Sequence, residues 1–204
     1  MFKRSPYIAK SLFRPGTMAR NFHTSRDLIV TQQVNTNDCT RASIATILNH
    51  LAKQKIASIS GVNDFLLERC AEYRSRNIDG LQPALETKAA IDLFKKYGFF
   101  AQRMNLDSSM LINRVELEKL MFPLQNGLIL ASTQPPGNPS TLGHSVVITD
   151  VFYNDVAKEL NVGIFDPYPM RDRDCNGRRT LSIHDILGVD LNALIYVSSN
   201  ETRN

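Results

Sequence analysis

The stretch Gln33-Val-Asn-Thr-Asn-Asp-Cys39-Thr-Arg-Ala-Ser-Ile-Ala-Thr-Ile-Leu-Asn-His50-Leu51 joins a polar turn to one cysteine and then to an apolar pattern. Ile44, Leu48 and Leu51 recur at the spacing of one helical face, and smaller or polar residues occupy the other faces. The pattern predicts a helix that is buried along one side and that starts close to the cysteine.

Cys39 is the candidate nucleophile of this chain. Asn37 and Asp38 are residue types that prefer the N-cap position, so the helix is expected to start at one of them and to place Cys39 in its first turn. Unpaired N–H groups and the positive end of the helix dipole favour a thiolate there. With a protonated histidine nearby, the pKa of a cysteine falls from about 8.5 into a range of about 3.5–7.5. The alternative is a small residue packed inertly at a helix start, so the choice depends on the partners of Cys39.

Length and composition predict one folded domain. The chain has 204 residues, of which 43% are hydrophobic, and this is enough for a single core. It has no apolar run long enough to cross a membrane, so we expect no membrane span. Cys39, Cys70 and Cys175 are an odd number of cysteines without metal-ligand spacing. This argues against a disulfide framework or a zinc site and favours a reducing compartment.

The charge is concentrated in the first 29 residues. Residues 1–29 contain six basic residues and one acid, a net charge of +5, whereas the remainder has 18 basic and 19 acidic residues, a net charge of −1. The basic character of the chain therefore belongs to its N-terminal segment. The expected folded part, residues 30–204, gives no general reason to predict nucleic-acid binding.

The N-terminal segment has the composition of a mitochondrial transit peptide, because it is rich in arginine and hydroxyl residues and poor in acids. Its first part is amphipathic on a helical wheel and ends at Pro15. Two processing routes are compatible with Arg20: a cut after Phe22, or a cut after Asn21 followed by removal of the octapeptide Phe22–Ile29. We expect residues 1–29 to be a presequence that is read by the mitochondrial import and processing machinery and leads to the matrix. The alternative is a basic arm for lipid or nucleic acid.

The order of expected elements predicts the fold class. Helical patterns are followed mainly by strand patterns, which predicts an α+β fold with an antiparallel sheet. The helices are expected near residues 37–51, 62–76, 84–97 and 115–121, the strands near 99–104, 127–132, 144–153, 160–166 and 193–198, a loop at 133–143, and a short helix at 182–187 with Ser182 as a possible cap.

The histidines can be tested as partners of Cys39 by geometry. His50 is eleven residues further along the same helix, about 16 Å along the axis, so it cannot contact the thiol. His184 lies in the expected short helix, where a surface or capping role fits better. His144 starts an apolar strand directly after a Gly/Pro-rich loop. If the next strand forms a hairpin with it, Asp166 comes alongside His144, and a carboxylate there would fix the tautomer of the imidazole.

These residues resemble the papain-like peptidases that process the double-glycine leaders of bacteriocins, over about residues 30–170. The matching positions are Gln33 six residues before Cys39, Asp38-Cys39, Ala42, Gly80-Leu81, Gly143-His144 and Phe165-Asp166-Pro167. The resemblance implies a papain-like fold, in which a helical half with the nucleophile helix packs against a C-terminal antiparallel sheet. It also implies a triad of Cys39, His144 and Asp166, with Gln33 as oxyanion donor and with no cofactor or metal. The family usually has glycine after the cysteine, where this chain has Thr40.

Three functions are consistent with this pattern. The first is a mitochondrial cysteine peptidase that hydrolyses a peptide or isopeptide bond in a peptide or protein substrate. The second is an acyl-transfer enzyme that uses the same triad to pass the acyl group to an amine or thiol. The third is a binding or assembly protein that kept the fold and lost turnover.

Overall fold

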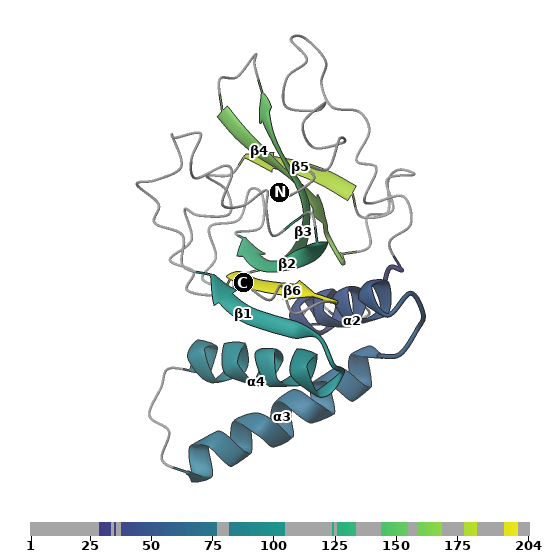
Figure 1. Ribbon diagram of the computed structural model, residues 1–204. Coiled ribbons are helices and arrows are strands. Elements are labelled where there is room, and N and C mark those ends of the chain that lie inside the picture. The colour runs from purple at the N-terminus through teal and green to yellow at the C-terminus, as the bar shows by residue number, and fades with distance from the viewer. Residues whose placement is uncertain are drawn as a thin grey trace, which may run out of the picture.

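The structure is a computed structural model that describes residues 29–33, 35, 38–76, 82–104, 124, 126–133, 144–154, 159–168, 178–182 and 194–199. Within this part, the helices precede the sheet along the chain (Figure 1). The elements are α2 (Cys39–Leu51), α3 (Ile59–Ser75), α4 (Gln82–Lys96), β1 (Phe100–Met104), β2 (Gly127–Thr133), β3 (His144–Asn154), β4 (Glu159–Phe165), β5 (Arg178–Ser182) and β6 (Leu194–Ser198). The predicted α+β class is confirmed.

The strands form one six-stranded sheet in the order β1-β6-β2-β3-β4-β5. All five pairings are antiparallel, and β6, the last strand among the described residues, inserts between β1 and β2. The hairpin of β3 and β4 is the one that the sequence predicts. Its register pairs Val147 with Phe165, and a shift between Ile148 and Asp150 marks a bulge further along the strand.

The helices cover one face of the sheet. α2 contacts β2 and β3, α4 contacts β1 and β6, and α3 packs on the outside against both other helices. Figure 1 shows this layering, with α3 and α4 side by side below the sheet and α2 close to β6 and β2. The predicted arrangement, a cysteine helix packed against an antiparallel sheet, is thus confirmed.

Strand alternation divides the core into two apolar clusters. Leu128 and Leu130 of β2 face the helices, where they join Leu48 of α2 and Phe94 of α4. Ile129, between the two leucines, belongs to the cluster on the opposite face of the sheet. Side chains of α2 that face the sheet, such as Ile44 and Leu48, are fully buried. Burial of this helix face against β2 and β3 therefore places the first turn of α2 close to the start of β3.

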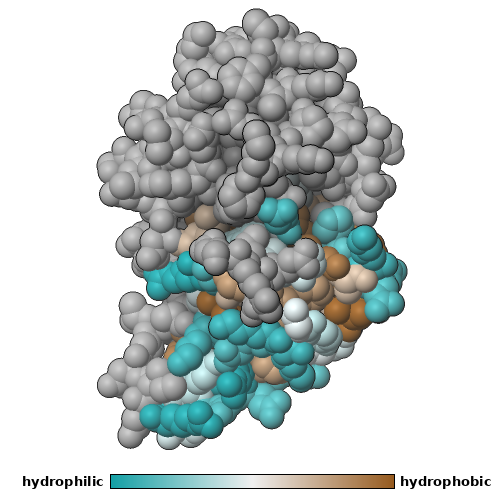
Figure 2. Space-filling model, in the orientation of Figure 1, coloured by the Kyte–Doolittle hydropathy of each residue, from teal (hydrophilic) through white to brown (hydrophobic). Residues whose placement is uncertain are grey.

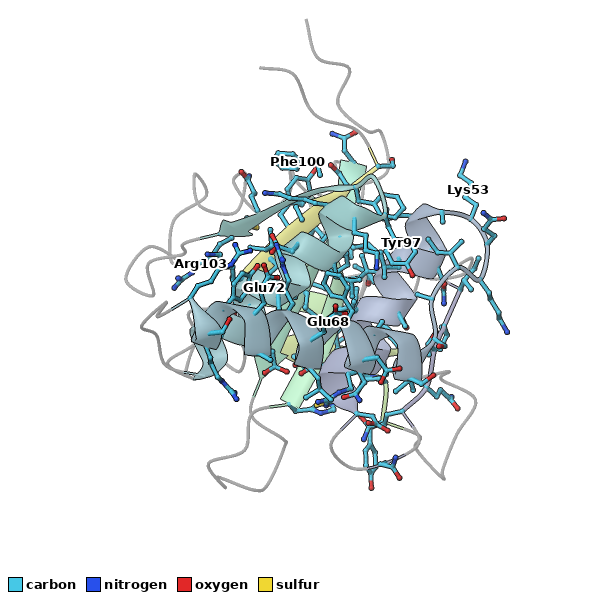
Figure 3. All side chains as sticks on the ribbon, turned by 90° about the horizontal axis from the view of Figure 1, so that it is seen from below. Lys53, Glu68, Glu72, Tyr97, Phe100 and Arg103 are labelled. Atoms are coloured by element: carbon cyan, nitrogen blue, oxygen red, sulfur yellow. The ribbon has the colours of Figure 1, made fainter. Side chains whose placement is uncertain are left out.

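Polar contacts fix the outer helix. Arg69 of α3 donates from Nε to Asp92 Oδ2 of α4 at 3.0 Å and forms an ion pair with Glu72. The buried Tyr73 also donates its hydroxyl hydrogen to Asp92. Figure 3, which looks at the molecule from below, shows Glu68 and Glu72 along α3. Hydrophilic residues prevail over α3 and α4 on the face drawn in Figure 2. None of the helices in the described part combines the length and the apolar character that a membrane span needs.

Most strand boundaries differ from expectation by a single residue, and three larger differences have a structural reading. α3 begins at Ile59 and not near residue 62, because Ser58 caps it by accepting a hydrogen bond from the Gly61 N–H. α4 begins at Gln82, two residues earlier than predicted. Ser182 is not a helix cap: it is the last residue of β5, where it pairs with Asn161 of β4. The helix at 115–121, most of the loop at 133–143 and residues 183–187 lie outside the described residues.

Candidate active site

The structure confirms where the cysteine helix begins. α2 starts at Cys39, with Asp38 as the N-cap residue. The side chain of Asp38 does not cap the helix. Its Oδ2 instead accepts hydrogen bonds from the backbone N–H and the side-chain amide of Asn35, at 3.1 and 3.0 Å. Asp38 therefore closes the polar turn before the helix, and Cys39 occupies the first helical position, where the helix dipole favours a negative charge.

The start of β3 brings His144 to Cys39. His144 is the first residue of β3 and shares a hydrogen bond with the Cys39 thiol. Its Nε2 lies 2.7 Å from Asp166 Oδ1. Since Nε2 faces the carboxylate, Nδ1 is the ring nitrogen that remains for the thiol. The imidazole thus connects a sulfur on one side with a carboxylate on the other.

Asp166 reaches His144 through the register of the β3–β4 hairpin. Val147 pairs with Phe165, so one step further along the hairpin Asp166 comes level with Val146. Val146 and His144 lie two residues apart on the same face of β3, which makes Asp166 and His144 diagonal neighbours. Asp166 is 2% exposed, and its Oδ1 also accepts from the Tyr168 N–H at 2.9 Å. The carboxylate is therefore held in position from the protein interior.

The electrostatics of the pair favour thiolate and imidazolium. For Cys39, burial acts to raise the pKa, but the hydrogen bond with His144, N–H donation from Ser145 and Thr40, and the charge of the imidazolium together hold the pKa below its usual value. For His144, burial acts to lower the pKa, but hydrogen bonds with Asp166 and Cys39 raise it to about 9. The two groups titrate as a coupled pair in which each stabilises the charged form of the other.

Gln33 is placed beside this group by its backbone. Its N–H donates to the carbonyl oxygen of Pro167 at 2.9 Å, directly after Asp166 in the chain. Its side chain is buried, with Nε2 donating to the Asn35 carbonyl at 3.2 Å. One N–H of the amide is therefore engaged, which leaves one for another acceptor. The Oε1 atom has no hydrogen-bond partner in the part of the chain that the structure describes. A role as oxyanion donor stays a prediction.

Two hydroxyl residues bind the helix start to the strand start. Thr40 Oγ1 and Ser145 Oγ lie 2.7 Å apart, and Ser43 Oγ donates to the Ser145 carbonyl oxygen at 3.1 Å. The sequence marks Thr40 only as a departure from the family pattern and gives Ser145 no role. The one available signal is position, because each residue directly follows a candidate site residue, Cys39 or His144.

The other candidate thiols and imidazoles lie apart from this group or outside the described residues. Cys70 is half-buried in α3 and packs against the helix-side core. Burial and the charge of Glu86 raise the pKa of Cys70. The protonated thiol is therefore favoured over the reactive thiolate. His50 lies in the last turn of α2, at the far end from Cys39. Cys175 and His184 fall among the residues that the structure does not describe.

Comparison with known proteins gives a distant structural likeness and no sequence match. No model of a protein family matches this chain, and a comparison with curated proteins finds no match. Among solved structures, the crystal structure of the Pseudomonas avirulence protein AvrPphB is similar, with 13% sequence identity and a TM-score of 0.39. The similarity covers 83% of this chain and 95% of that chain. It is a distant likeness, so the assignment of residues depends on the geometry of this chain itself.

Proposed function

We propose that this chain is a papain-like cysteine peptidase of the mitochondrial matrix, which hydrolyses a peptide or isopeptide bond. The observation that carries this proposal is the row of Cys39, His144 and Asp166, in which the imidazole bonds a helix-start thiol and a buried carboxylate. This row provides a nucleophile, a base and a group that orients the base. An inert core cysteine would need none of these neighbours.

The mechanism follows from the charges of the resting pair. The Cys39 thiolate attacks the carbonyl carbon of the scissile bond and forms a tetrahedral oxyanion. The His144 imidazolium donates its proton to the leaving amine, and the chain is left acylated on Cys39. The neutral imidazole then takes a proton from water, whose oxygen attacks the thioester and releases the acid. Asp166 keeps the ring oriented and stabilises its charged form during both steps.

The oxyanion would be bound at the start of α2. The Cys39 N–H is one of the uncapped donors at this helix terminus, and the second N–H of the Gln33 amide is the other candidate donor. Such a donor typically stabilises the transition state by about 2.7–4 kcal/mol. No cofactor enters any of these steps.

The experiment compares two proteins that differ by one sulfur atom. Wild-type protein and Cys39→Ser are incubated with a mitochondrial matrix extract, and the new N- and C-termini are identified by mass spectrometry. We expect termini that appear only with the wild type, because serine lacks the thiolate that the site stabilises. Cys70→Ser is the matched control and should keep them. If both proteins give the same termini, the peptidase proposal is wrong.

The same extract distinguishes hydrolysis from acyl transfer. A peptide fragment with a free carboxylate is the product of hydrolysis, whereas addition of a small primary amine would give an amide at the same position if transfer prevails. If iodoacetamide alkylates Cys39 but neither the free carboxylate nor the amide forms, the third function is favoured, a binding or assembly protein on this fold.

A further inference from the structure

We propose that Thr40 and Ser145 are a positioning pair, whose hydroxyl-to-hydroxyl hydrogen bond sets the alignment of Cys39 with His144. This inference depends on the proposed function, because it assigns these residues a part in the same site. Neither residue is expected to touch the substrate, so both act through the cysteine and the histidine that precede them in the chain.

The first support is the arrangement of donors around the sulfur. The backbone N–H groups of Thr40 and Ser145 both donate to Cys39, one from the helix and one from the strand. The side chains of the same two residues bond to each other at 2.7 Å. The helix donor and the strand donor are therefore connected to each other, which limits how far the two donors can separate around the sulfur.

The second support is the degree to which Ser145 is fixed. Its N–H faces Cys39, its hydroxyl bonds Thr40, and its carbonyl oxygen accepts from Ser43 Oγ at 3.1 Å. Ser145 is buried, with 6% exposure, and Ser43 is fully buried. The three hydrogen-bond partners named here lie on the first turns of α2, and in the sheet Ser145 pairs with Ser132 of β2. Successive side chains of a strand point to opposite faces of the sheet. The Ser145 side chain therefore points toward α2, and the His144 side chain points to the face of the sheet on which Asp166 lies.

This arrangement explains why a hydroxyl residue follows the cysteine. A glycine at position 40 would leave the Ser145 hydroxyl without this partner. The hydrogen bonds from Ser43 to Ser145 and between Cys39 and His144 would then join the helix start to the strand start without it. Small displacements matter in such a site, because a misplacement of about 1 Å can lower a reaction rate by about 10²-fold. A part-buried hydrogen bond of ordinary length that joins helix and strand directly is suited to prevent such a displacement.

The test uses three single variants of the full chain, the double variant of Thr40→Val with Ser145→Ala, and one control. Thr40→Val removes the hydroxyl with nearly unchanged volume, Thr40→Ser keeps it, and Ser145→Ala removes its partner. For each, the rate of Cys39 alkylation by iodoacetamide is measured against pH, together with turnover on the substrate found with matrix extract. Thr149→Val is the matched control, because it removes a buried hydroxyl from the same strand, where Thr149 donates to the Gly163 carbonyl at 3.2 Å.

We expect Thr40→Val and Ser145→Ala to shift the alkylation pKa toward the usual cysteine value by about half a unit to one unit. We expect turnover to fall by about 10-fold or more. Thr40→Ser should restore both, and the double variant should cost no more than either single variant, since one bond is lost in each case. Thr149→Val should lower thermal stability and leave the pKa unchanged.

The results separate this inference from the proposed function. If the wild type shows a lowered, His144-dependent alkylation pKa and Thr40→Val leaves it unchanged, the positioning pair is overturned and the peptidase proposal stands. Equal shifts in Thr40→Val and Thr149→Val would also overturn it, because loss of stability would then explain both. If the wild-type thiol titrates as an ordinary cysteine, the pair and the proposed function fail together.

Discussion

Gln33 has a buried amide whose Oε1 atom has no hydrogen-bond partner among the described residues. Gln33→Ala should lower turnover by about 10²–10³-fold, because an oxyanion donor acts on the transition state. The alkylation rate of Cys39 should stay nearly unchanged, since alkylation forms no oxyanion. Gln32→Ala, at an exposed neighbouring position, is the matched control. Equal losses of turnover and alkylation in Gln33→Ala would show that this residue supports the structure of the site and not the oxyanion.

Asp150 shows a second effect of burial on a titrating group, away from the row of Cys39, His144 and Asp166. Burial raises the pKa of Asp150 to about 6, although its carboxylate accepts a hydrogen bond from the Val151 N–H. Below the unfolded pKa of this acid, near 4, the raised folded pKa costs no stability. As the pH rises from there through the folded pKa of about 6, the free energy of unfolding falls. The cost at neutral pH is at most about 3 kcal/mol.

Asp150→Asn should therefore increase the free energy of unfolding at pH 7 and change it little at pH 4, because asparagine keeps an acceptor for Val151 and loses the charge. Urea denaturation at the two pH values measures this difference. Asp64→Asn, on the exposed side of α3, is the control and should change little at either pH. A loss of stability in Asp150→Asn at pH 7 would mean that the charged carboxylate has a stabilising partner.

At the residue scale, the sequence predicts the row of Cys39, His144 and Asp166 as neighbours, because helix start, loop-to-strand position and hairpin pairing are all local signals. The contact between Thr40 and Ser145 cannot be read in this way. It joins residues 105 positions apart and depends on how the start of α2 docks on β3. No local sequence pattern specifies how close the two side chains come in space.

β2 and β6 approach each other closely at Gly127. A Cβ atom at this position would overlap the carbonyl oxygen of Val197 and approach the ring of Tyr196 to 2.7 Å. Gly127→Ala should therefore destabilise the protein by about 1–3 kcal/mol, because the two strands must move apart. Gly61→Ala is the matched substitution, since its Cβ would meet only Ser58 Oγ at 3.4 Å within α3.

For Gly61→Ala we expect a gain of about 0.5–1 kcal/mol, because alanine is the better helix former. Denaturation curves of the two variants, recorded side by side, measure the contrast. Similar free energies of unfolding for Gly127→Ala and the wild type would show that the spacing of β2 and β6 can relax.

At the element scale, strongly periodic segments were predictable and weakly patterned ones were not. The central strands β2 and β3 contain continuous apolar runs, and β4 has apolar residues at alternate positions. The structure places all three strands within a few residues of the expected ranges. β5 has only five residues, two of which are arginines, so it contains no apolar run from which a strand could be predicted. The segment becomes a strand because it pairs with β4. Ser182, which was expected to cap a helix, pairs with Asn161 of β4 instead.

For the whole molecule, the proposed presequence can be compared with the first residues of the described fold. Val30 packs against the helix-side core, and the backbone N–H of Thr31 donates to Thr46 Oγ1 at 2.9 Å. Asn49, which is 1% exposed, donates to the Thr31 hydroxyl. Removal of residues 1–29 preserves these contacts, whereas removal of residues 1–32 deletes all of them.

We predict import into the matrix with loss of about 21 to 29 residues, because the basic amphipathic segment is typical of matrix targeting. N-terminal sequencing of the protein isolated from mitochondria checks this, and a mature chain that still begins at Met1 would contradict it. A recombinant chain that begins at Val30 should match the longer one in thermal stability. A chain that begins at Gln33 should be less stable, since the Thr31 contacts with α2 are lost.

The alkylation rate of Cys39 against pH, in wild type and in His144→Ala, tests whether Cys39 and His144 form a thiolate–imidazolium pair. Labelled peptides are identified by mass spectrometry, so that Cys70 in the same protein serves as the internal reference. In the wild type, Cys39 should be alkylated at pH values well below the usual cysteine pKa of about 8.5, ahead of Cys70. In His144→Ala, the profile of Cys39 should move up toward that value. If the profile of Cys39 is the same in both proteins, the pair does not exist and the account is wrong.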